Sequence, residues 1–108
     1  MTNVQFIKHN DYIVGVVCKG HTGYAEYGKD IVCASISAIV GSACLGITNV
    51  LGINATIKRK DNDGYLELRL PKKLSDELVV KSQIIFKTML VSLQDIQKGY
   101  PSNINVEV

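Results

Sequence analysis

A histidine and a cysteine lie at opposite ends of a glycine-spaced segment in the first third of this chain, and together they could form a cysteine nucleophile with its base. His21 stands near the start of the segment, and Cys33 follows Asp30 where an apolar run begins. Asp30 is a typical helix N-cap, since its carboxylate can accept a hydrogen bond from the amide of residue 32 or 33. The pattern therefore places Cys33 in the first turn of a helix.

The first turn of a helix favours a negatively charged sulfur. Its amide groups lack partners within the helix, and the helix dipole is positive at that end. A nearby imidazole would stabilise the thiolate further and could transfer a proton to a leaving group. The glycines of the segment allow the loop to fold back, which would bring His21 toward Cys33. A histidine and a cysteine twelve positions apart are common, so the spacing alone does not establish this contact.

The residues around this pair resemble those of the bacterial ribosomal-processing cysteine proteases. The shared motif lies between positions 20 and 37 and comprises Gly20, His21, Gly23, Tyr24, Ala25, Gly28, Asp30, Ile31, Val32, Cys33, Ala34 and Ser37. Chain length and the order of the expected elements also match, so the resemblance covers essentially the whole chain. Thr22 departs from the motif, because a smaller alanine is expected there.

The resemblance implies a function. Members of that family remove a short N-terminal extension from large-subunit ribosomal protein twenty-seven during ribosome assembly. Their catalytic histidine corresponds to His21 and their nucleophile to Cys33, with Gly20, Asp30 and Ser37 as possible supporting residues. They cut after a pair of phenylalanines, which implies an apolar substrate pocket, and they are homodimers. We place the pocket between the glycine loop and a stripe of small residues on the following helix.

Several roles stay open at this level. Asp30 can orient His21, cap the helix, or do both. The Ser37 hydroxyl can bond to the catalytic pair or to the carbonyl of Cys33. Tyr24 and Tyr27 can form walls of the substrate pocket or anchor the loop. The amide of Cys33 is a candidate donor to the oxyanion of a peptide hydrolysis that passes through an acyl-enzyme.

Two other functions compete with proteolysis. The first is a non-enzymatic dimeric module that binds a ribosomal protein or ribosomal RNA, with Cys33 as a core residue only. The second keeps the catalytic pair but transfers acyl groups between small molecules.

Composition narrows the class of protein. The 108 residues suit one domain, residues 1–108, with a formal charge of +2 that does not indicate DNA binding. The basic cluster Lys58, Arg59 and Lys60 is followed by Asp61 and Asp63, which is typical of a solvated hairpin tip. The three cysteines, an odd number with no closely spaced pair, suit a reducing compartment, and the spacing of the cysteines and histidines does not suit zinc. We expect no cofactor and no metal.

The N-terminal residues lack the features of a signal peptide. Serine, glycine, threonine and asparagine interrupt the longest apolar region, 31–51, a poor composition for a bilayer span. We therefore expect a cytoplasmic protein that does not insert into membranes.

Hydrophobic periodicity predicts the order β-β-α-β-β-α-β. Strands are expected at 4–8, 12–19, 53–60, 64–70 and 104–108, with one helix after Asp30 that ends at 49–52 and another after Ser75 that ends at Gly99. Hairpins force antiparallel pairing, and two helices suffice to cover one face. The expected fold is α+β and two-layered, a mixed, mainly antiparallel sheet with both helices packed on one face. Cys18 and Cys44 are expected in the core. The helix after Asp30 carries an apolar stripe at helical spacing that is expected to pack on the sheet and that ends with Ile47 and Val50.

Overall fold

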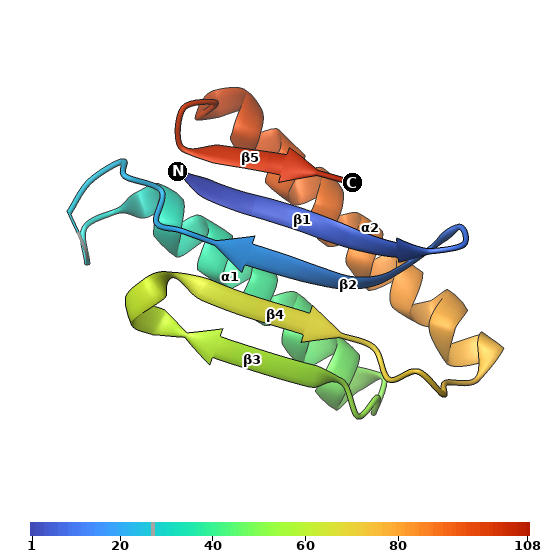
Figure 1. The fold of residues 1–108 in the computed structure, drawn as a ribbon. Coiled ribbons are helices and arrows are strands. Elements are labelled where there is room, and N and C mark those ends of the chain that lie inside the picture. The colour runs from blue at the N-terminus through green and yellow to red at the C-terminus, as the bar shows by residue number, and fades with distance from the viewer. Residues whose placement is uncertain (27) are drawn as a thin grey trace.

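A five-stranded sheet carries both helices on one face in the computed structural model, which describes residues 1–26 and 28–108 (Figure 1). The strand order is β3-β4-β2-β1-β5. All neighbouring strands are antiparallel except β1 and β5, which are parallel. The strands are β1 (Thr2–His9), β2 (Tyr12–Lys19), β3 (Thr56–Lys60), β4 (Tyr65–Arg69) and β5 (Ile104–Glu107). The predicted fold class and element order are confirmed.

The helices begin at the predicted caps. Helix α1 (Ile31–Leu45) is capped by Asp30, whose side chain accepts from the amide of Cys33. Helix α2 (Asp76–Gly99) is capped by Ser75, whose hydroxyl accepts from the amide of Leu78. Each cap supplies an acceptor to a first-turn amide that has no partner within its own helix.

The helix after Asp30 changes its number of residues per turn before it ends. Residues Gly46–Val50 form a π turn that continues α1, and the amide of Leu51 donates to the carbonyl of Gly46, five residues earlier. The wider turn moves the apolar stripe around the helix axis. As a result Ile47 is fully buried, whereas Val50, which the periodicity assigns to the buried face, is 80% exposed.

One hydrophobic cluster joins the helices to the sheet. Its fully buried members include Phe6, Val16 and Leu68 from the strands and Phe86 and Leu93 from α2. Cys18 and Cys44 lie in this cluster, as predicted. The stretch Ile31–Val50 is long and apolar enough to cross a membrane by length and composition alone, contrary to the expectation from its polar interruptions. Here one face of it is buried, and Val32, Val40 and Ile47 on that face belong to the hydrophobic cluster.

The strand predicted at 53–60 is shorter than expected. Residues 53–55 form an irregular link, and β3 begins only at Thr56. Ile53 is nevertheless 2% exposed, because its side chain enters the core from this link and does not depend on strand pairing. All five residues of β3 are exposed, so β3 forms a charged outer edge of the sheet.

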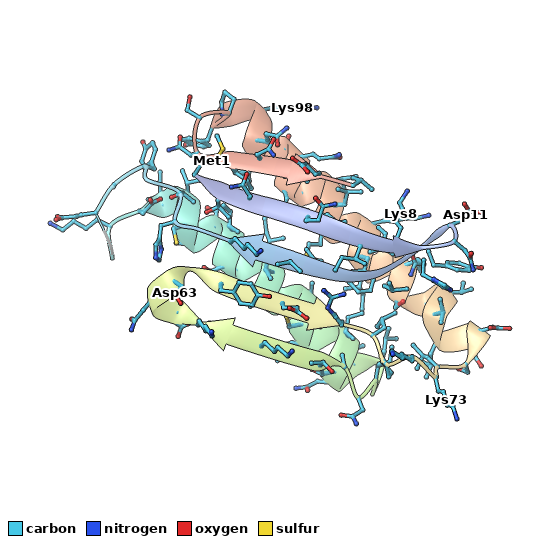
Figure 2. The ribbon with its side chains drawn as sticks, viewed as in Figure 1. Met1, Lys8, Asp11, Asp63, Lys73 and Lys98 are labelled. Carbon is cyan, nitrogen blue, oxygen red and sulfur yellow. The ribbon has the colours of Figure 1, made fainter. Side chains whose placement is uncertain are left out.

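One end of the sheet gathers segments that are far apart in the sequence. Strand β2 ends there, next to the start of β1 and the turn between β3 and β4 (Figure 1). Figure 2 labels Met1 and Asp63 at this end, with Lys8 and Asp11 at the opposite end. The glycine loop between β2 and α1 leaves the sheet at the Met1 end, so the candidate site is built there.

Candidate functional site

Cys33 lies in the first turn of α1, as predicted. Its amide donates to Asp30 Oδ1 at 2.8 Å, and its side chain is partly buried with a free thiol. The amide of Ala34 donates to the carbonyl of Asp30 at 3.0 Å. The Cys33 amide, a candidate oxyanion donor in the sequence analysis, is therefore engaged by the helix cap.

Asp30 ties the glycine loop to the start of α1. Its Oδ2 atom accepts from the Thr22 hydroxyl and from the backbone amides of Tyr24, at 3.0 Å, and Ala25, at 3.2 Å. Desolvation tends to raise the pKa of Asp30, but the hydrogen bonds from Thr22 and from the Cys33, Ala25 and Tyr24 amides outweigh it and lower the pKa to about 2. The capping role is thus present. Within the described residues, the hydrogen bonds of this carboxylate run to the loop and the helix, and none runs to His21.

Thr22, the departure from the motif, is part of this arrangement. It is 2% exposed, and its hydroxyl donates to Asp30 while its carbonyl accepts from Asn103 Nδ2 at 2.9 Å. An alanine would fill less space and would leave Asp30 without the hydroxyl donor. The loop residue next to His21 is therefore fixed both to the helix start and to the segment that leads into β5.

His21 is exposed and reaches the turn between β3 and β4. Its Nε2 atom lies 3.0 Å from the Asn62 carbonyl oxygen. Asn62 belongs to a short 3₁₀ turn, Asp61–Asp63, that closes the hairpin. The sequence marked this segment as a hairpin turn, but the pattern held no signal that the turn would contact His21.

Gly20 holds the backbone before His21 in a conformation that favours glycine, with φ +91°. A Cβ atom at Gly20 would lie 2.5 Å from the Met1 carbonyl oxygen. The Gly20 carbonyl in turn accepts from the Thr2 hydroxyl at 3.0 Å. Gly20 is therefore needed for the close approach of the first residues of the chain.

His21 and Cys33 line the same cavity, which has a volume of about 570 Å³. One wall is the glycine loop, and another is the small-residue side of α1, including Ser37 and Gly41. Ile36, Val40 and Leu66 add apolar surface, while Arg59 and Asp61 come from the β3–β4 hairpin. The cavity lies where the sequence analysis placed the substrate pocket, and it has the apolar lining with a few polar groups that is typical of ligand sites.

The remaining predicted site residues take different positions. Ser37 lines the cavity, but its hydroxyl makes neither of the two bonds considered for it within the described residues. The Tyr24 ring packs edge-on against Tyr100 with ring centroids 5.3 Å apart, and it is not part of the cavity lining. This favours the loop-anchor role for Tyr24. Tyr27 lies outside the described residues.

The hairpin side of the cavity was not foreseen from the sequence. Arg59 and Asp61 form an ion pair at 3.4 Å, and both line the cavity together with Gly64 and Tyr65. The charge cluster was interpreted as a solvated hairpin tip, and its side chains are indeed exposed. What the sequence could not reveal is that this tip packs beside the glycine loop, more than thirty residues away along the chain.

Known proteins are similar to this chain over almost its whole length. A model of the family described as cysteine protease Prp matches residues 1–105. A relative from Bacillus subtilis, named ribosomal processing cysteine protease Prp, is 31% identical over 98 residues, which cover 91% of this chain and 88% of the relative. A protein of the same name from Staphylococcus aureus is 36% identical over 94 residues, covering 87% and 85%.

Solved structures match over nearly the whole chain. The S. aureus Prp protease in complex with a covalently linked product peptide superimposes with a TM-score of 0.85 at 33% identity, covering 99% of this chain and 98% of that one. The same protease with a substrate peptide gives a TM-score of 0.81 at 30% identity, with both chains fully covered. SMU.848 from Streptococcus mutans, at 23% identity and a TM-score of 0.85, shares the fold.

Proposed function

Because this chain belongs to the cysteine protease Prp family, we propose that it removes the N-terminal extension of large-subunit ribosomal protein twenty-seven, with Cys33 as nucleophile and His21 as general acid and base. The chain is a cysteine protease of the ribosomal-processing type. The observation that carries the finer proposal is the shared cavity. A partly buried thiol at a helix N-terminus and an exposed imidazole both line it.

The proposed reaction has two steps. The Cys33 thiolate attacks the scissile carbonyl carbon, the C–N bond breaks, and the protonated His21 ring gives its proton to the departing amine. Water then attacks the thioester while His21 takes its proton, and the Cys33 sulfur leaves. A covalently linked product peptide in the S. aureus relative supports a route through the sulfur. Backbone amides not engaged by Asp30 are the proposed donors to the oxyanion.

The substrate side of the proposal depends on the shape and lining of the cavity. A volume of about 570 Å³ lined in part by Ile36, Val40 and Leu66 has room for apolar side chains of an extended peptide. The relative that was solved with a substrate peptide is a ribosomal processing protease. These two points support an aromatic or aliphatic segment of a ribosomal protein as the ligand.

Incubation with the precursor of ribosomal protein twenty-seven tests the proposal. We expect intact protein to shorten the precursor, and we expect Cys33→Ala to reduce the rate by at least about 10³-fold, because it removes the nucleophile. Cys44→Ala is the matched control on the same helix, since Cys44 is 8% exposed and lies in the core. Cleavage that survives Cys33→Ala would exclude the assigned nucleophile. Mass spectrometry of both fragments distinguishes hydrolysis from acyl transfer.

The proposal also includes a homodimer in the cytoplasm. Helix α2 exposes Val80, Ile84 and Val91, at 53%, 72% and 58%, and burying such side chains against a second chain is favourable. Three free thiols are suited to a reducing compartment.

A further inference from the structure

The β3–β4 turn contacts the residue that the proposed function makes the general acid and base. His21 is exposed, so burial alone does not fix its ring. The Nε2 atom nevertheless lies 3.0 Å from the Asn62 carbonyl oxygen, forty-one residues along the chain. A carbonyl oxygen can only accept a hydrogen bond, so Nε2 must be the protonated nitrogen. When the ring is neutral, its free lone pair is therefore on Nδ1.

Gly64 brings the turn close enough for this contact. It follows the 3₁₀ turn Asp61–Asp63 in the left-handed conformation, with φ +61°. A Cβ atom at Gly64 would lie 2.7 Å from the Gly20 carbonyl oxygen and 3.2 Å from His21 Cε1. The first distance is shorter than Cβ atoms tolerate, so any side chain at position 64 would push the turn away from Gly20 and His21.

The backbone at Gly20 is also held from the side opposite the hairpin turn, by the first two residues of the chain. The Gly20 carbonyl accepts from the Thr2 hydroxyl, and the Met1 carbonyl lies against the Gly20 α-carbon. Thr22 is bonded to Asp30 and Asn103. The backbone on both sides of His21 is thus fixed by the chain start and the helix cap, and the hairpin turn supplies the hydrogen bond to the ring itself.

We propose that the Asp61–Gly64 turn is the positioning element for His21, with the Asn62 carbonyl holding the ring as its Nε2–H tautomer so that Nδ1 is free to exchange the proton of the Cys33 thiol. This inference rests on the proposed function. In many nucleophile–base pairs a third group orients the base. Among the described residues, the hydrogen bonds of the Asp30 carboxylate run to the loop and the helix and not to the His21 ring, so Asp30 does not fill that place.

A glycine pair provides a matched test. Gly64→Ala and Gly52→Ala both place a side chain at positive φ, +61° and +66°, so both carry the same kind of backbone strain. Only Gly64 has backbone atoms in the way, since a Cβ atom at Gly52 would meet nothing within 4 Å. We expect Gly64→Ala to lower kcat for peptide cleavage by about tenfold or more with KM changed by less than about twofold, because general acid–base catalysis contributes ~10²–10⁴-fold. Gly52→Ala should leave kcat within about twofold.

The ring tautomer provides a readout that does not depend on activity. Long-range ¹H–¹⁵N correlation spectra are recorded on Cys33→Ala protein at about pH 8.5, where an unperturbed imidazole is neutral and no thiolate holds a second proton on the ring. We expect His21 as the Nε2–H tautomer, and a shift toward a mixture when Gly64→Ala is added. His9, the other histidine of the chain, is the internal reference.

Two results would overturn the inference. One is a His21 ring in the Nδ1–H form, or in an even mixture, in the Cys33→Ala protein without further change; this measurement needs no altered glycine and holds even if Gly64→Ala does not fold. The other is an unchanged kcat in folded Gly64→Ala. Failure of the unmodified protein to cut the precursor would instead overturn the proposed function, so the two failures are distinguishable.

Discussion

Cys33 differs from the other two cysteines in the surroundings of its sulfur. Burial raises the pKa of Cys18 to about 12, and the neighbouring Cys44 contributes to the increase. Burial also raises the pKa of Cys44, although Arg59 opposes the change. Both sulfurs are held as thiols within the core, whereas Cys33 is partly buried at the lining of the cavity.

The three thiols should therefore differ in their reactivity toward an alkylating reagent. At neutral pH, we expect iodoacetamide to add once to the folded protein, at Cys33, and three times after unfolding in urea, because the thiolate is the reactive form and the two core sulfurs are protonated and covered. Peptide mapping by mass spectrometry identifies the sites, and Cys33→Ala should show no native adduct. A Cys33 that reacts no faster than free cysteine would contradict an activated thiol.

The lowered pKa of Asp30 predicts that this carboxylate stabilises the fold at neutral pH and that the stabilisation is lost in acid. Its pKa is lowered from 3.8 to about 2 in the folded chain, so the ionised carboxylate stabilises the fold. That stabilisation is fully present above the ordinary value and is lost as the pH falls through about 2. Asp30→Asn keeps one capping oxygen for the Cys33 amide, but its NH₂ group cannot accept from Thr22, Tyr24 or Ala25.

Urea unfolding at several pH values measures this contribution. Above about pH 4 we expect Asp30→Asn to have a lower free energy of unfolding than the unmodified protein, and we expect the difference to shrink toward pH 2. We also expect slower peptide cleavage, because the loop that carries His21 loses its tie to α1. A difference that stays constant from pH 5 to about pH 2 would show that the charge of Asp30 does not stabilise the fold.

At the scale of elements, Gln83 joins α2 to β2 where the sheet is irregular. The register of β1 and β2 shifts between Ile7 and Lys8. On β2, the amide of Ile13 donates to Gln83 Oε1 and its carbonyl accepts from Gln83 Nε2, both at 2.8 Å. Gln83 is 6% exposed, so its amide group supplies both partners to a buried backbone that water does not reach.

Replacing Gln83 by leucine should be strongly destabilising. Two buried backbone groups would lose their partners, at about 1–3 kcal/mol for each, so we expect the free energy of unfolding to fall by roughly 2–6 kcal/mol. Denaturant titration monitored by circular dichroism measures the change. Gln94→Leu, at a half-buried position of the same helix, is the control and should cost much less. Equal losses would show that the Ile13 bonds contribute little.

The whole molecule brings four separate segments together at one end of the sheet. Thr2, Gly64 and Asn103 come from three of these segments, and each contacts the fourth, residues 20–22, which contains His21. The parallel pairing of β1 with β5 places the chain start beside the segment that leads into β5. The candidate site therefore requires the complete sheet, because no single hairpin contains these contacts.

At the scale of the whole molecule, we predict that two chains associate into a homodimer. We expect sedimentation velocity to give twice the 11.8 kDa of one chain, because exposed side chains such as Ile84 on α2 leave apolar surface in water. The Ile84→Lys variant should weaken the dimer if this helix face is buried in it, and Lys87→Ala, on an exposed position of the same helix, is the control. A monomer at tens of micromolar protein would contradict the proposed homodimer.

The sequence by itself determined the order of the secondary-structure elements and the position of Cys33 at the start of a helix. Alternating and helical periodicities, the caps Asp30 and Ser75, and the hairpin turn after Lys60 are local signals, and the structure follows them. The place of Cys33 in the first helical turn is a consequence of the Asp30 cap three residues earlier. These features depend on neighbours within a few residues, so they can be read without a fold.

Only the tertiary structure decided which distant residues complete the site. The contact of His21 with Asn62, the fit of Gly64 against Gly20, and the engagement of Ile13 by Gln83 join residues between forty and seventy positions apart. The π turn that exposes Val50 likewise breaks the period on which its burial was predicted. Such contacts depend on how strands and helices pack. The local sequence around a backbone carbonyl or a glycine does not indicate which distant group will contact it.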